Sequence, residues 1–365
     1  MLGTPINTDP KIPALGRVYA LDGLRGLAIG LVLLRHLVPS AFGGAGFVGV
    51  QLFFVLSGFL ITTLLFEERA RSGRISFGAF YVRRALRLLP ALYGLLITYA
   101  AFRLIVWRAS DLDAWVGWVG LAAAYLTPFA GALNIPQATG LNPLWTLSVE
   151  EIFYLLWPLV LVAGFRFLTN RSIAVVTAAL IAVAIGVRVL TFIGFGGEIY
   201  ETPSTWIDAL LIGCLLAQLR QAGALPTWRQ WWVPVLLALP LAVASFWGGA
   251  KDSALMFGPG LTLLAIFAAA LIWVCTSQDG LPSFPVKLLR SRVARYLGTR
   301  SYGLYLWNGV FLLQPVVRGS YPLLLASLVA SFVAAELSYR LIEMPALKLK
   351  KRLQTGRANS VGREV

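Results

Sequence analysis

One histidine occurs in the 365 residues, and it shares an apolar stretch with an arginine. Arg25 and His36 are eleven residues apart within residues 21–41, which we expect to form one helix. That separation is about three helical turns, so both side chains share a helix face roughly 16 Å apart. An imidazole exchanges protons near neutral pH, so His36 is a candidate general base. The alternative is a structural histidine bonded to a neighbouring helix.

Asp22 stands three residues before Arg25. This spacing puts opposite charges on one side of a helix, where they stabilise each other. Asp22 is therefore the predicted neutralising partner of Arg25, which would hold an anionic group or orient His36. The alternative is an interfacial ion pair near the start of the helix.

Two adjacent acids stand at the start of a further apolar run. Ser148 and Glu151 have the S-x-x-E spacing of a capping box, which assigns Glu151 a structural task. Glu150 has no such task, and we expect it to meet His36 or Arg25 across a helix bundle. A carboxylate paired with a histidine orients the ring and raises its basicity. The alternative is that Glu150 only complements the helix dipole.

Arg83, Arg84 and Arg87, here called the arginine cluster, precede Pro90 and another apolar segment. Their spacing brings the three side chains to one side of a helix, and guanidinium groups bind phosphates bidentately. The cluster therefore predicts a phosphate site. Ordinary anchoring of a basic loop at the membrane surface is the alternative.

Isolated polar residues also stand in apolar runs. Asp208 and Asn308 are candidates for a supporting role in a site or for helix pairing, and we expect Glu343 at the membrane interface. Cys214 and Cys275 lie in apolar runs, which favours neither a disulfide nor a metal site.

The composition is 58% hydrophobic and 13% charged, which excludes an ordinary soluble domain. Continuous apolar runs of about 17–25 residues predict an all-α, polytopic bundle of about ten transmembrane helices, ten or eleven in all, rather than a β-barrel. The net charge of +15 comes from basic residues in short loops. That is the positive-inside pattern and indicates contact with membrane lipids, not nucleic acid.

The basic loops also predict the topology. Residues 1–16 form a cytoplasmic tail, 17–345 one transmembrane domain, and 346–365 a basic cytoplasmic tail. Residues 115–133 are expected to be non-spanning or re-entrant, because Pro128 and several glycines interrupt them. The alternative is that they cross and that the charge rule fails at the short loop with Arg166 and Arg171. Ten crossings are predicted near residues 21–41, 47–66, 91–107, 147–165, 172–194, 205–219, 231–248, 257–276, 302–317 and 322–342. We expect both termini in the cytoplasm and no cleavable signal peptide.

In their order and spacing, these stretches resemble the membrane-bound acyltransferase 3 family over nearly the whole chain. The matching stretches are Leu21–Gly26 with the Arg-x10-His spacing to His36, Leu52–Ile61, Tyr81–Pro90, Leu144–Glu151, Ser301–Trp307, and Glu343 before Pro345. By this resemblance Arg25 and His36 match an essential pair, and Arg84 and Arg87 match an Arg-x-x-Arg motif near acyl-CoA.

Two positions depart from the family pattern. Members often carry Asp where this chain has Gln51, and His where it has Asn308. His36 is then the sole imidazole, which excludes a two-histidine scheme. Some relatives carry an additional C-terminal esterase-like domain.

The resemblance implies an O-acyltransferase of the bacterial inner membrane. It would take an acyl group, typically acetyl, from cytoplasmic acyl-CoA as co-substrate, with no permanently bound cofactor. The acceptor would be a hydroxyl of a sugar, glycan, lipid-linked saccharide or glycosylated metabolite. The competing functions are a proton-coupled transporter or flippase of acyl or glycan substrates, which the lack of an internal repeat disfavours, and a non-catalytic sensor or scaffold.

In the resulting mechanism, the phosphates of CoA lie against the arginine cluster. His36, held by Glu150, takes the proton of the acceptor hydroxyl, while Arg25 stabilises negative charge or orients the thioester. Direct attack and an acyl-enzyme on His36 are both compatible with these residues. His36 lies about 20 Å from Leu21 along the helix. We therefore expect transfer across the membrane to an external acceptor.

Overall fold

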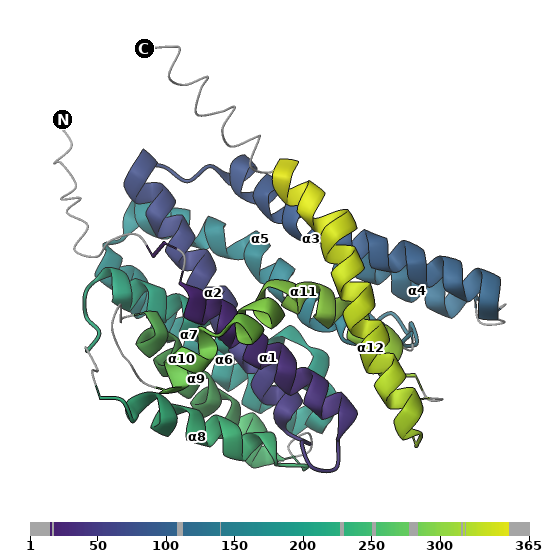
Figure 1. Ribbon diagram of the computed structural model, residues 1–365. Helices are drawn as coiled ribbons and strands as arrows, with labels where there is room; N and C mark the ends of the chain where they lie inside the picture. Colours follow the sequence, from purple (N-terminus) through teal and green to yellow (C-terminus); the bar gives the residue numbers. More distant parts are fainter. Residues whose placement is uncertain are drawn as a thin grey trace. The chain divides into compact units, whose positions relative to one another are not determined.

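The computed structural model describes residues 15–16, 18–107, 112–138, 140–226, 230–249, 253–276, 284–314, 317 and 319–349. Across these ranges every regular element is a helix (Figure 1), so the all-α prediction is confirmed. The predicted tails 1–16 and 346–365 lie mostly outside the described residues.

Six helical segments are long and apolar enough to cross a membrane, and each corresponds to a predicted crossing. They are Ala45–Ser72 (α2), Phe77–Ile105 (α3, Phe77–Phe102, and its continuation), Leu144–Phe167 (α5), Asn170–Glu201 (α6, Asn170–Phe195, and its continuation), Met256–Thr276 (ending in α9, Leu261–Thr276) and Tyr321–Leu349 (beginning with α12, Tyr321–Ser338). The chain is thus a multi-pass membrane protein. The four other predicted crossings contain α1 (Tyr19–Leu37), α7 (Pro203–Gln221), α8 (Val233–Ser245) and α11 (Arg292–Leu312). These four are shorter or more polar, so the predicted count of ten is not confirmed.

The segment expected not to cross contains only a short helix. α4 (Leu112–Ala123) has 12 residues, about 18 Å at 1.5 Å per residue, against a hydrocarbon core of about 30 Å. A single 3₁₀ turn, Thr127–Phe129, follows. The Thr127 and Ser148 hydroxyls lie 2.7 Å apart and attach this turn to the start of α5. This geometry agrees with the expected interruption.

The helices group into two compact units. The first draws on residues 1–75 and 149–299, and the second on residues 76–148 and 300–365. α5 and α11 each contribute to both units. Each unit is described by itself below.

Glycines set the packing of the first unit. A Cβ on Gly58 of α2 would collide with the Leu210 carbonyl of α7, and one on Gly213 of α7 would collide with the Val55 carbonyl of α2. The two helix backbones therefore touch through reciprocal glycines, a common device where helices pack in membranes. α1 uses the same device, because a Cβ on Gly23 would strike the Leu289 carbonyl at the end of α10 (Phe284–Leu289).

In the second unit, tyrosines of α11 tie the other elements together. The Tyr302 hydroxyl donates to the Leu88 carbonyl of α3, 2.8 Å away. The Tyr305 hydroxyl donates to the Pro143 carbonyl, also 2.8 Å away, and accepts from Thr146 in the first turn of α5. The Ser301–Trp307 motif thus has a structural task in this unit.

Candidate functional site

Arg25 and His36 lie on one uninterrupted helix, α1, as predicted. Both side chains are half-buried. His36 stands in the last turn beside Arg35, where positive charge is favourable to the helix dipole. The apolar residues of α1 and its glycines bury one side of the helix, which holds the two polar side chains in fixed places along it.

The predicted pair of Asp22 and Arg25 is present. Arg25 Nη1 lies 3.7 Å from Asp22 Oδ1, and the side chains are 23% and 17% exposed. A contact of this length with partial solvent access contributes only modestly to stability. Asp22 therefore offsets the charge of Arg25 within the same helix.

The capping-box prediction for Ser148 and Glu151 is wrong. α5 begins at Leu144, directly after Pro143, so Ser148 lies inside the helix. Its hydroxyl bonds back to the Leu144 carbonyl at 3.3 Å, the usual alternative for a serine within a helix. Glu151 is half-buried in the second turn, which is too far along the helix for it to cap the first turn.

Glu150 is likewise beyond the first turn, so complementing the helix dipole is not its task. It accepts a hydrogen bond from the Ser57 hydroxyl of α2, with 2.5 Å between the oxygens. About two turns further along α5, the Trp157 indole donates to Thr62 of α2 at 2.8 Å. The serine of the Leu52–Ile61 motif is thus the docking point for Glu150.

The register of α1 against α2 sets the depth of Glu150. Gly46 faces Arg35, and Gly49 faces Ala28 and Val32, so the two helices run antiparallel. Ser57 lies eight residues beyond Gly49, about 12 Å along the axis. Ser57 and Glu150 are therefore level with the first half of α1. That is the Arg25 end, whereas His36 is near the opposite end.

Asp208 is buried, and its partner is an arginine that sequence reasoning missed. Arg188 of α6 is fully buried, and its Nη1 lies 2.6 Å from Asp208 Oδ2. Thr262 of α9 accepts from Arg188 at 2.6 Å and donates to Asp208 at 2.8 Å. Arg188 also donates to the Phe257 carbonyl in a π-helical turn, at 2.7 Å. This network joins three helices. Of the two roles considered for Asp208, a supporting role in a site and helix pairing, the contacts indicate helix pairing.

Gln51 also has a structural contact. It is fully buried in α2, and its amide donates to the Leu261 carbonyl of α9 at 2.5 Å. A carboxylate, which the family resemblance leads one to expect at this position, has no proton for that carbonyl when ionised. The glutamine therefore joins α2 to α9.

In the second unit, α3 (Phe77–Phe102) carries the arginine cluster. Ser76 caps the helix by accepting from the Ala79 amide at 3.4 Å. Arg83 and Arg84 are half-buried and Arg87 is exposed. All three lie within the first three turns, so the helix presents them close together.

Two buried or half-buried acids balance this positive charge. Glu343, expected at the interface, is only 8% exposed, and Arg87 and Arg300 act on it electrostatically. Arg300 also forms a 2.6 Å ion pair with Glu336 of α12. The cluster is thus part of a wider arrangement of charges rather than a bare surface anchor.

Asn308 is fully buried in α11. Its amide donates to the carbonyls of Leu304 and Tyr305 in the same helix, at 3.0 and 2.6 Å. Within the described part of the chain, no group of three or more His, Cys, Asp or Glu side chains is arranged to hold a metal ion.

The architecture and these residues define a polytopic helical membrane protein with a base and a cation on one helix and an arginine cluster on another. The family model of the acyltransferase domain matches residues 18–338. This protein therefore belongs to the acyltransferase 3 family.

Its sequence is similar to several bacterial proteins. It is 30% identical over 355 residues to a putative peptidoglycan O-acetyltransferase, YrhL, of Bacillus subtilis, covering 90% of this chain and 54% of the relative. It is 28% identical over 367 residues to peptidoglycan O-acetyltransferase OatA of Listeria monocytogenes, covering 91% and 56%. It is 30% identical over 348 residues to O-acetyltransferase OatA of Staphylococcus aureus, covering 90% and 57%.

The chain spans about half the length of these relatives. No solved structure matches it significantly.

Proposed function

We propose that this protein transfers an acetyl group from cytoplasmic acyl-CoA to a hydroxyl of a glycan. The observation that carries the proposal is the pairing of family membership with an intact, half-buried Arg25 and His36 on α1. The relatives named as peptidoglycan O-acetyltransferases support a glycan as acceptor. We place the protein in the cell membrane with both termini in the cytoplasm.

In this mechanism His36 is the general base. It takes the proton of the acceptor hydroxyl while that oxygen attacks the thioester carbonyl of the acyl-CoA. The tetrahedral intermediate then expels the CoA thiolate, the carbon–sulfur bond breaks, and the proton passes from His36 to sulfur. An acyl-enzyme on His36 is the alternative route, and a stable acetyl-imidazole trapped without acceptor would reveal it.

Arg25 stabilises the negative charge that develops on the thioester oxygen. The register of α1 and α2 supports Glu150 as a partner for Arg25 rather than a direct partner for His36, because Ser57 holds Glu150 level with the first half of α1. With Asp22 on the same helix, Arg25 would then be oriented by two carboxylates. This changes the expected mechanism, in which Glu150 holds the imidazole.

The arginine cluster binds the phosphates of CoA. Guanidinium groups bind phosphates bidentately, and three of them within three turns of α3 offer matching charge. Glu343, which interacts electrostatically with Arg87, supports this role by limiting the net positive charge when no ligand is bound.

The first experiment measures acetyl-CoA turnover and CoA binding by the purified full chain in detergent. His36→Ala is expected to bind CoA normally and to lower the turnover rate by a factor of about 10²–10⁴, the usual contribution of a general base. Arg84→Gln with Arg87→Gln is expected to weaken CoA binding by at least about tenfold. Arg71→Gln is the matched control, because Arg71 is exposed and paired with Glu67.

Three outcomes would reject parts of this assignment. If the wild type binds no CoA, the arginine cluster is a membrane anchor and the transporter hypothesis takes precedence. If His36→Ala retains turnover, His36 is not the base. If Arg71→Gln weakens binding as much as the double variant, the effect is general loss of surface charge.

A further inference from the structure

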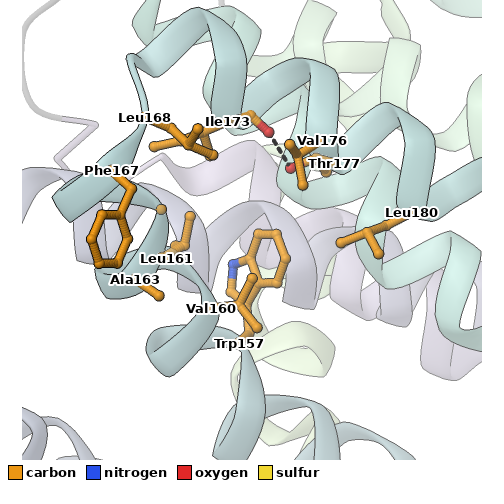
Figure 2. Close-up of a pocket in the computed structure, with 11 residues that line it drawn as sticks. Trp157, Val160, Leu161, Ala163, Phe167, Leu168, Ile173, Val176, Thr177 and Leu180 are labelled. Carbon is orange, nitrogen blue, oxygen red and sulfur yellow. Dashed lines mark hydrogen bonds between the residues drawn. The ribbon is translucent and has the colours of Figure 1, made fainter.

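An apolar groove of about 300 Å³ lies between α5 and α6 in the first unit, on the hairpin that joins them. Its floor is formed by buried Trp157, Leu161 and Ile173, and its rim by exposed residues such as Phe167 and Val176 (Figure 2). Gly164 lets the two helices approach at the hairpin end, because a Cβ there would lie 3.3 Å from Ile173. The groove is therefore open at its rim and closed below.

The polar groups in the groove already have protein partners. The Trp157 indole donates to Thr62. The Thr177 hydroxyl donates to the Ile173 carbonyl at 2.9 Å, drawn as a dashed line in Figure 2, and accepts from Gln218 at 3.0 Å. About ten water molecules at ~30 Å³ each would fill this volume, but they would find few hydrogen-bond partners there. The groove thus selects an apolar occupant.

Its length matches one leaflet of a membrane. The lining residues run along α5 from Trp157 to Phe167, about 15 Å at 1.5 Å per residue, and along α6 from Ile173 to Leu180. Half of a hydrocarbon core of about 30 Å is about 15 Å. One acyl chain of a glycerophospholipid in a single leaflet is therefore the apolar group that fits.

Positive charge stands at the hairpin end of the groove. The Arg166 guanidinium lies 5.7 Å from the ring of Phe167, which lines the groove. Arg171 is exposed at the start of α6, and the Arg69 guanidinium lies 3.8 Å from the ring of Phe165. Near Arg69 the acids are Glu67, which pairs with Arg71, and Glu68. The sequence around Arg166 and Arg171 has no acid between Glu151 and Glu198. The net charge there complements an anionic headgroup.

We propose that this groove is a binding site for an anionic glycerophospholipid. One acyl chain lies between α5 and α6, and the headgroup phosphate contacts Arg166 and Arg171 at the hairpin. The site is independent of the proposed acyltransferase activity and concerns a part of α5 that carries none of the proposed catalytic residues.

The test is native mass spectrometry of the full chain released from vesicles of phosphatidylglycerol or phosphatidylcholine. The wild type should retain phosphatidylglycerol in preference to phosphatidylcholine. Val176→Phe fills the groove and should lower the lipid-bound fraction at least about threefold. Val175→Phe is the matched control, because Val175 is exposed beside it but does not line the groove. Unchanged retention in Val176→Phe, or equal loss in both variants, would overturn the site.

The headgroup contact is tested by a separate pair of variants. Arg166→Gln with Arg171→Gln should weaken phosphatidylglycerol retention, by roughly fivefold for each arginine, and should remove the preference over phosphatidylcholine. Lys287→Gln, which removes an exposed charge elsewhere in the same unit, is the control. Equal retention of the two lipids by the wild type would overturn the choice of an anionic headgroup.

A measurement on the wild type alone tests the site without depending on whether the variants fold. Phosphatidylglycerol with a photoreactive group in its acyl chain should label peptides that contain residues 157–180 several times more strongly than other apolar segments. Labelling spread evenly over all exposed helix faces would show that lipid does not select this groove.

Discussion

Two ion pairs in the first unit differ in how they are held. Arg188 and Asp208 are buried, lie 2.6 Å apart, and share Thr262 as a common neighbour. Arg25 and Asp22 are partly exposed and 3.7 Å apart on a single helix. The first pair joins three helices, whereas the second joins one helix to itself.

This difference distinguishes a structural arginine from a candidate functional arginine better than residue type alone does. An arginine whose donors are used by carbonyls, a hydroxyl and a carboxylate has none to offer a substrate without breaking the fold. Arg25 is partly exposed and lies farther from its acidic partner, so its side chain is accessible from solvent. Burial together with bonding therefore marks Arg188 and Asp208 as part of the scaffold.

The largest expected effect is on the buried pair. Asp208→Asn leaves the Arg188 charge buried without its carboxylate, which should lower the free energy of unfolding by about 3–5 kcal/mol. Unfolding in detergent, followed by circular dichroism, measures this loss. Stability within about 1 kcal/mol of the wild type would mean that the buried pair is not needed to join the three helices.

Much of the local chemistry was predictable because it lies on one helix. The spacing of Asp22, Arg25 and His36 fixes their relation once α1 is recognised. The start of α5 was misjudged because Ser148 and Glu151 fit a local capping pattern. Pro143, directly before the helix, was the stronger signal, since proline commonly starts a helix.

Contacts between distant segments were not predictable in the same way. Arg188 was missed because its segment is strongly apolar on average, so the segment was interpreted only as a membrane crossing. It was a usable signal, because a charge in such a run demands a partner, but nothing local identifies Asp208 as that partner. The reciprocal contact of Gly58 and Gly213 likewise depends on which helices are neighbours.

A smaller loss is expected where α2 meets α7. Gly58→Ala introduces a Cβ against the Leu210 carbonyl, which must move away. Such overpacking costs about 1–3 kcal/mol. Gly30→Ala is the control, because a Cβ on Gly30 of α1 would have open space. Unfolding of both variants under the same conditions measures the difference, and equal stability would show that the close backbone contact is dispensable.

The pairing of Arg25 with Glu150 is tested by a double-mutant cycle on turnover. If the carboxylate orients Arg25, then Arg25→Gln and Glu150→Gln together should cost less than the sum of the single changes. The expected coupling is about 0.5–3 kcal/mol. The same cycle with His36→Gln in place of Arg25→Gln is the comparison. A larger coupling of Glu150 to His36 would restore the mechanism in which the carboxylate holds the imidazole.

The smallest effect is expected for Asp22→Asn, the same chemical change as Asp208→Asn made in the looser pair. Partly exposed ion pairs contribute about 0–1 kcal/mol, and Asp22 is 17% exposed at 3.7 Å from its partner. Its substitution should therefore leave the unfolding curve nearly unchanged while Asp208→Asn shifts it strongly. A loss of stability at Asp22 as large as that at Asp208 would remove the distinction, because α1 would then depend on its ion pair as the α6–α7–α9 contact depends on Arg188.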